Sequence, residues 1–167
     1  MSRHSCRGRG SFDEGEFFRA IDRSGARVLL IGRRALIVIG IPVLTADYDL
    51  WVHADDARKL NDALAVFDMV PSREPDAARS VGRYVIENGE RIDVLVARQV
   101  STQDGVHVRF DDVFARSERV QTADGAFVHV PVVEDLILTK RFGARPKDAA
   151  DIDLLRAFEA KKGRPRG

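Results

Sequence analysis

The chain has 167 residues, a length that suits one domain with a sizeable buried core. Its 44% hydrophobic and 32% charged residues are typical of a soluble globular protein, and its longest apolar run, Ala35 to Val43, is about half of what a membrane-spanning helix needs. We therefore expect no membrane association. The N-terminus lacks the apolar segment of a secretory signal, and one cysteine cannot form an internal disulfide, so a cytoplasmic location is favoured.

The formal net charge of +1 conceals two basic ends. Residues 1–10 contain three arginines and no acid, and residues 161–167 contain two lysines and two arginines. We predict a basic tail at 1–10, one domain at 11–162 and a second basic tail at 163–167. Basic tails attract polyanions, although a disordered, solvated end is the simpler explanation of either tail alone.

A helix and a buried strand are predicted at the start of the domain. Ser11 and Glu14 have the spacing of a capping box, and Gly25 would end the helix that follows. Residues 28–31 form an apolar run that is too short for a helix. We therefore expect a central buried strand there, ending at Gly32.

Two further helices are expected on either side of a strand that carries acids. Residues 33–39 predict a short buried helix, and residues 44–52 predict the acid-bearing strand. The next helix would begin at Asp55 or Asp56 and end before the proline-containing segment 71–75.

A hairpin follows, because Asn88-Gly89 separates two apolar segments and both residue types tolerate the positive φ of a tight turn. Strand alternation puts Asp93 on the face opposite Ile92 and Val94. The remaining predicted elements are a hairpin around Asp124-Gly125, a helix from Pro131 to Phe142, and a last helix after Pro146.

Asp47 and Asp49 are the first candidate site residues. Residues two apart on a strand share a face, so the two carboxylates would repel each other. Mg²⁺ held by one or two carboxylates and by substrate phosphates relieves such repulsion, whereas a solvated turn is the alternative explanation. Trp51 shares this face, where an aromatic core residue is favoured over one that stacks on a base.

Lys140 is the second candidate. Val133, Leu136, Ile137 and Lys140 follow helical spacing, so the lysine falls on the stripe that faces the protein. A buried ammonium needs an anion. The alternative is a buried aliphatic stem with a charged head that reaches solvent.

The order of these features resembles the nucleotidyltransferase superfamily, whose best-known member is DNA polymerase beta, and within it the small bacterial AbiEii-type, toxin-like proteins. The resemblance covers roughly Val28 to Phe158. Its motifs lie at 30–36, 40–50, 91–95, 134–140 and 145–151. It implies an α/β domain with a mixed, largely antiparallel sheet, flanking helices and C-terminal helices.

The resemblance also implies a two-metal site. Asp47 and Asp49 would be primary Mg²⁺ ligands, Asp93 the third ligand, and the substrate an NTP. Lys140 would serve the nucleotide phosphates, completing a catalytic set of four residues. Further nucleotide-site positions are Gly32, Arg33, Arg34, Thr45, Arg145, Asp148 and Asp151.

Arg33 and Arg34 depart from the family pattern, which has small residues after this glycine so that helix N–H groups can approach phosphate. The two arginines could contact phosphate themselves, which we favour, or they could block the pocket. Asp148 and Asp151 could orient Lys140 or Arg145, or act as first-turn acids that the helix dipole favours.

Two functional hypotheses result. The first is an enzyme that moves an NMP from an NTP to a hydroxyl; the resemblance suggests a tRNA 3′ end as acceptor and a role as the toxin of a toxin–antitoxin pair, with a cognate antitoxin protein as partner. An aminoglycoside or a protein side chain remains open as acceptor. The second is a degenerate module that binds nucleotide or a partner without catalysis.

Overall fold

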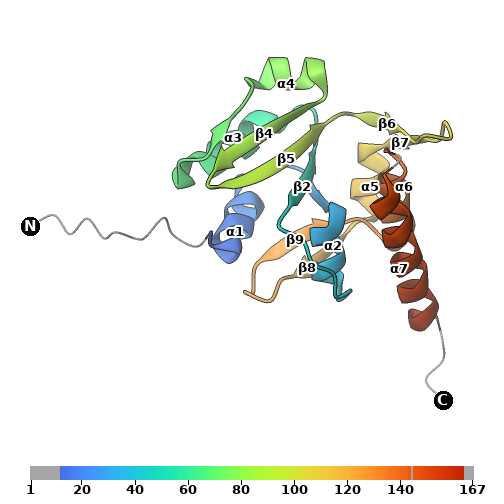
Figure 1. The fold of residues 1–167 in the computed structure, drawn as a ribbon. Helices are drawn as coiled ribbons and strands as arrows, with labels where there is room; N and C mark the ends of the chain where they lie inside the picture. Colours follow the sequence, from blue (N-terminus) through green and yellow to red (C-terminus); the bar gives the residue numbers. More distant parts are fainter. Residues whose placement is uncertain (1–11, 144, 164–167) are drawn as a thin grey trace, which may run out of the picture.

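The computed structural model describes residues 12–143 and 145–163 (Figure 1). The predicted tail at 1–10, the Ser11 half of the predicted capping box, and residues 164–167 of the second tail lie outside the described residues. Within the part of the chain that the structure describes, no helix has both the length and the apolar character needed to cross a bilayer.

Helices and strands are mixed along the chain. The helices are α1 (Glu14–Ser24), α2 (Gly32–Ile39), α3 (Ala57–Leu64), the 3₁₀ helix η1 (Ala65–Phe67), α4 (Pro75–Val81), α5 (Phe110–Arg116), α6 (Val133–Lys140) and α7 (Pro146–Lys162). The strands are β1 (Val28–Ile31), β2 (Tyr48–Val52), β3 (Val70–Pro71), β4 (Arg83–Asn88), β5 (Glu90–Val96), β6 (Gln99–Ser101), β7 (His107–Arg109), β8 (Glu118–Gln121) and β9 (Phe127–Val130).

The main sheet has seven strands in the order β3-β4-β5-β2-β1-β9-β8, and β6 and β7 form a separate small sheet. In the main sheet the β2–β5 and β1–β9 pairs are parallel, and the other four pairs are antiparallel. The predicted fold class, a mixed and largely antiparallel sheet with flanking helices, is confirmed.

The two faces of the sheet differ in what covers them. Tyr84, Ile86, Ile92 and Val94 point to the face that packs into the main core with side chains of α1 and α3. On the other face, Trp51 joins a smaller apolar cluster with residues of β7 and α5. Figure 1 shows α5, α6 and α7 grouped together, with α7 running toward the C-terminus. The rest of this second face, on β4 and β5, is only partly buried.

The first helix begins two residues later than a cap at Ser11 would give. Asp13 is the N-cap, and its carboxylate accepts a hydrogen bond from the amide of Glu16 at 3.0 Å. Gly25 ends the helix in the left-handed region, at φ 74°.

The acid-bearing strand is shorter than predicted, because β2 starts at Tyr48 rather than at residue 44. Its partner β1 ends at Ile31, which pairs with Asp49, and the chain then turns into α2. Residues 44–47 therefore lie beyond the end of β1, so Asp47 precedes the strand while Asp49 lies within it.

The sequence analysis did not predict five elements, namely β3, α4, β6, β7 and α5. Pro75 begins α4 at its first turn, where a proline is tolerated, rather than simply breaking a helix. The β6–β7 hairpin and α5 fill the interval between the two predicted hairpins. Their segments are three to seven residues long, too short to give a clear periodic pattern.

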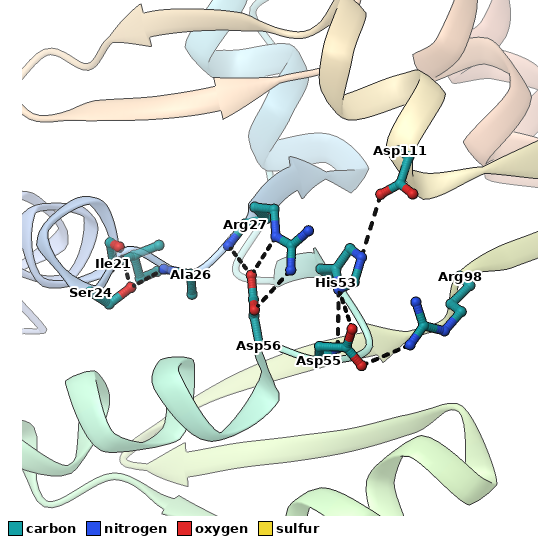
Figure 2. A network of polar contacts seen from close by, with 9 residues as sticks. All are labelled: Ile21, Ser24, Ala26, Arg27, His53, Asp55, Asp56, Arg98 and Asp111. Carbon is teal, nitrogen blue, oxygen red and sulfur yellow. Dashed lines mark hydrogen bonds and ion pairs between the residues drawn. The ribbon is translucent and has the colours of Figure 1, made fainter.

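A polar network joins α1, β1, β2, α3 and α5 at the end of β2 away from Asp49 (Figure 2). The Asp56 carboxylate accepts from the backbone amide and from Nε of Arg27, each at 2.8 Å. His53 Nδ1 accepts from the amide of Asp55 at 3.0 Å, and its Nε2 faces Asp111 Oδ1 at 3.4 Å. Arg98 donates to Asp55 at 2.8 Å. These contacts tie the start of β1 and the end of β2 to the start of α3 and to α5.

We expect Asp56→Asn to lower the free energy of unfolding by about 1–3 kcal/mol at neutral pH, because Asp56 is 2% exposed and its charge-assisted bonds to Arg27 would be lost. Hydrogen bonds from Arg27 lower the pKa of Asp56 in the folded state. Its contribution is therefore complete above the unfolded pKa of about 3.9 and is lost as the pH falls toward the lower folded value.

Urea unfolding from about pH 7 down to about pH 3.5 measures the difference in free energy of unfolding between the wild type and Asp56→Asn. This difference should become smaller as the pH is lowered. Asp62→Asn, on the exposed side of the same helix, is the matched control and should change stability by less than about 0.5 kcal/mol. An equal loss for Asp56→Asn at every pH would contradict the ionic origin of the effect.

Candidate active site

A cavity of about 630 Å³ opens on the partly buried face of β4 and β5 and extends to α6 and the start of α7. Its apolar floor includes Val85 and Leu95. Acids and bases surround this floor. The acidic and basic residues that line the cavity are Asp49, Arg73, Arg83, Arg91, Asp93, Lys140, Arg145 and Asp148.

Asp49 and Asp93 stand side by side in this cavity. They are paired residues in the parallel β2–β5 ladder, so their side chains leave the sheet on the same face. Burial raises the pKa of Asp49 above its ordinary value, and the charges of Asp93 and Asp47 raise it further. Arg91 lies 3.4 Å from Asp93 Oδ1. These two carboxylates form an acidic centre, and their role as metal ligands stays a prediction.

Gly32 lies against this acidic centre at the turn from β1 into α2. Its φ is +69°, and a Cβ at this position would stand 2.5 Å from Asp49 Oδ2. Any side chain would therefore both strain the backbone and displace the carboxylate. The close approach to Asp49 therefore requires glycine at this position.

Lys140 faces inward, as its helical spacing predicted, and is 5% exposed. Its Nζ donates to Asp151 Oδ2 at 2.8 Å, and Arg33 Nε donates to Asp151 Oδ1 at 3.1 Å. Burial alone would raise the pKa of Asp151, but the hydrogen bonds from Lys140 and Arg33 outweigh burial and lower it. The anion that this buried ammonium requires is thus Asp151, which ties α2, α6 and α7 together.

The adjacent arginines of α2 turn away from the cavity. Arg33 binds Asp151 and donates to the carbonyl of Leu44 at 3.2 Å. The guanidinium of Arg34 lies 4.2 Å from the centre of the Tyr48 ring and donates to the carbonyl of Thr45 at 3.1 Å. Neither side chain is among the described residues that line the cavity, so neither fills it. Their contact with phosphate stays a prediction.

Asp47 and Thr45 lie on the loop before β2. The Thr45 hydroxyl accepts from the amide of Asp47 at 3.0 Å, and neither residue is among the described lining of the cavity. In residues 12–143 and 145–163, no three His, Cys, Asp or Glu side chains are grouped closely enough to hold a metal ion. Asp49 and Asp93 nevertheless suit Mg²⁺, which is usually held by one or two carboxylates together with substrate phosphates.

The contacts of Asp148 and Trp51 bear on two alternatives left open by the sequence: whether Asp148 orients a basic residue or is only a first-turn acid, and whether Trp51 is a core aromatic or stacks on a base. Arg145 Nε donates to Asp148 at 3.2 Å, and both residues line the cavity, so Asp148 has a partner at the site as well as its first-turn position. Trp51 is fully buried, packs against Phe110 and donates from Nε1 to the carbonyl of Ala97. It is the core aromatic that the sequence analysis favoured.

Sequence reasoning missed three arginines and one aromatic side chain that line the cavity. The missed residues are Arg73, Arg83, Arg91 and Phe142. Strand alternation could have identified one of them, because Arg91 and Asp93 are two apart on a strand and share its face. The others depend on how β3, β4 and the turn after α6 pack, for which the sequence carries no local signal.

We expect Gly32→Ala to destabilise the protein more than Gly25→Ala does and to weaken NTP binding. Both glycines have positive φ, at 69° and 74°, but no atom lies within 4 Å of a Cβ built on Gly25. The control should therefore lose only about 1–2 kcal/mol for the left-handed backbone. Urea unfolding and calorimetric NTP titration measure both effects. Equal losses for the two variants would contradict the close approach to Asp49.

Comparisons with known proteins identify the fold. No family model and no curated protein matches the sequence. The lincosamide antibiotic adenylyltransferase LnuA, solved with lincomycin, is 14% identical over 89% of this chain and 99% of its own, with a TM-score of 0.59. ANT(2″)-Ia, solved with adenylyl-2″-tobramycin, is 13% identical over 88% of each chain, with a TM-score of 0.57.

A third solved structure, a Thermotoga maritima protein assigned as a nucleotidyltransferase, is 14% identical over 88% of this chain and 85% of its own, with a TM-score of 0.53. At such identities the likeness concerns the fold and leaves the AbiEii-type branch a prediction. The chain has the nucleotidyltransferase fold.

Proposed function

We propose that the protein is a Mg²⁺-dependent nucleotidyltransferase that moves an NMP from an NTP to a hydroxyl acceptor and releases pyrophosphate. The observation that carries this proposal is the pairing of Asp49 with Asp93 in a cavity that also contains Lys140 and Arg145. Carboxylates that can bind a divalent cation and cationic side chains that can bind phosphate then lie in one cavity. Phosphoryl transfer requires this combination.

The chemistry joins the acceptor oxygen to the α-phosphorus of the NTP and breaks the bond from that phosphorus to the departing pyrophosphate. The hydroxyl proton passes to a carboxylate of the site, for which Asp93, with a half-buried side chain, is the candidate. Asp49 and Asp93, with Asp47 as an additional ligand, would hold Mg²⁺, which would supply positive charge to the triphosphate. The protein itself takes little part in the covalent chemistry. Its side chains position the NTP and the acceptor hydroxyl and neutralise the negative charge of the phosphates.

Two basic side chains suit the triphosphate in different ways. Lys140 is buried and held by Asp151, so its position is fixed before substrate arrives. Arg145 is largely exposed and bound only through Asp148 in the described contacts, so its side chain has room to close on a phosphate. The first turn of α2 begins at Gly32, where helix N–H groups favour an anion.

The charge of the cavity favours RNA as acceptor over an aminoglycoside. Arg73, Arg83 and Arg91 line the side formed by the strands, where they would repel a polycationic aminoglycoside and attract a phosphodiester backbone. An RNA 3′ end, such as that of a tRNA, supplies both the hydroxyl and the negative charge. A role as the toxin of a toxin–antitoxin pair, with a cognate antitoxin as partner, follows from the family resemblance alone.

The alternative is a module that binds nucleotide without catalysis. It requires Arg33 and Arg34 to fill the turn after Gly32 where phosphate would bind, called here the phosphate turn. Both guanidinium groups instead bind Asp151, Tyr48 and the loop carbonyls outside the cavity. That contact pattern supports the enzyme over the degenerate module.

We expect Asp49→Asn to lower the rate of NMP transfer by about 100-fold or more, because even outer-shell partners of a metal ligand change activity by about 10- to 100-fold. The assay incubates the protein with each α-labelled NTP, Mg²⁺ and total RNA and measures label in RNA. Asp153→Asn, an exposed acid on α7, is the matched control and should keep full activity. Transfer by Asp49→Asn at the wild-type rate would refute the proposed metal site, and no label in any RNA with any NTP would refute the RNA acceptor.

We expect Arg83→Gln to reduce the salt dependence of RNA use, because one phosphate contact changes the slope of log KM against log salt by about 1. The KM for RNA, measured at several salt concentrations, gives this slope. Arg156→Gln on the exposed side of α7 removes the same charge outside the cavity lining and should leave the slope unchanged. An unchanged slope in Arg83→Gln as well would exclude Arg83 as a phosphate contact.

A further inference from the structure

We propose that Phe142 is the surface on which the nucleobase of the NTP stacks, an inference that rests on the proposed function and assigns a site for the base. Phe142 follows Lys140 by two residues, in the turn between α6 and α7. Both side chains line the same cavity. The base would therefore lie beside the residue proposed to contact the phosphates.

The ring of Phe142 is the aromatic surface that the cavity offers. The described lining contains two aromatic residues, Tyr84 and Phe142. Tyr84 is almost fully buried, and its hydroxyl donates to Asn61 in the main core. Phe142 is only partly buried, so part of its ring remains open to a ligand. A nucleobase, which is flat and weakly hydrated on its faces, suits such a ring.

Two neighbours hold the ring in place from the protein side. Trp51 packs against Phe142 at nearly a right angle, with ring centres 5.7 Å apart. Trp51 is itself fixed by its indole hydrogen bond to Ala97. Leu95 belongs to the same apolar cluster and also lines the cavity. The ring is therefore supported on apolar side chains rather than free to rotate away.

The tip of the β6–β7 hairpin fixes the backbone of the same turn. The amide of Gln103 donates to the carbonyl of Arg141 at 2.8 Å, and its side-chain Nε2 donates to the carbonyl of Phe142 at 3.0 Å. The tip is internally bonded, because the Thr102 hydroxyl accepts from the amide of Val106 at 2.9 Å. The β6–β7 hairpin thus holds the backbone of the turn that connects Lys140 to Phe142.

The experiment separates base from phosphate. We expect Phe142→Ala to weaken binding of the preferred NTP by about 5- to 100-fold, the range for loss of one base-stacking contact, while binding of inorganic tripolyphosphate stays unchanged. Calorimetric titration with each of the four NTPs and with tripolyphosphate, all with Mg²⁺ and without acceptor, gives both affinities. Phe114→Ala is the matched control, because Phe114 is partly buried at the edge of the same apolar cluster but lies outside the cavity lining.

Conservative variants cover the case in which Phe142→Ala fails to fold. Phe142→Tyr should bind NTP as the wild type does, whereas Phe142→Leu, which keeps an apolar side chain but no ring, should show the loss. Equal weakening of NTP and tripolyphosphate, or NTP binding that is unaffected by loss of the ring, would overturn the base site and leave the proposed function intact. A wild-type protein that binds no NTP would overturn both.

Discussion

The parallel pairing of β2 with β5 is the constraint on which the candidate site depends. It sets Asp49 directly opposite Asp93, so two carboxylates must share one side of the sheet. Burial of Asp49 and its repulsion by Asp93 raise the pKa of Asp49, and a bound cation would offset the cost of keeping both carboxylates charged. The antiparallel pairing with β1 brings Gly32 against the same carboxylate and leaves no space there for a side chain.

The fully buried carboxylate of Asp151 fixes the side of the cavity formed by α6 and α7. Asp151 accepts hydrogen bonds from both Lys140 and Arg33, so one carboxylate positions a cavity lysine and removes an arginine from the phosphate turn. A buried carboxylate with two charged donors is well satisfied, and loss of either donor would leave it underpaired. The geometry of α2, α6 and α7 at the cavity therefore depends on a single acid whose side chain is wholly inside the protein.

Local sequence patterns predicted the orientation of Asp93 and Lys140 but not the residues that bound the cavity. Alternation within β5 and helical spacing within α6 are local patterns, and they correctly placed Asp93 off the core face and Lys140 inward. The destinations of Arg33 and Arg34 were not local, because Arg33 meets an acid 118 residues away and Arg34 meets an aromatic ring across a loop. The contribution of Phe142 likewise depends on Trp51 and on the β6–β7 hairpin, which no periodic pattern announced. For Asp47 the sequence analysis extended the strand too far. It placed Asp47 within the strand, but the pairing with β1 ends at Asp49 and β2 starts at Tyr48.

We propose that Asp49 and Asp93 hold a divalent cation against the phosphates of an NTP. Anomalous X-ray diffraction from crystals grown with Mn²⁺ and a non-hydrolysable NTP analogue tests this proposal. We expect a Mn²⁺ peak coordinated by both carboxylates and by phosphate oxygens, with the phosphates extending toward Lys140. A nucleotide bound elsewhere, or Mn²⁺ that does not contact Asp49 and Asp93, would contradict it.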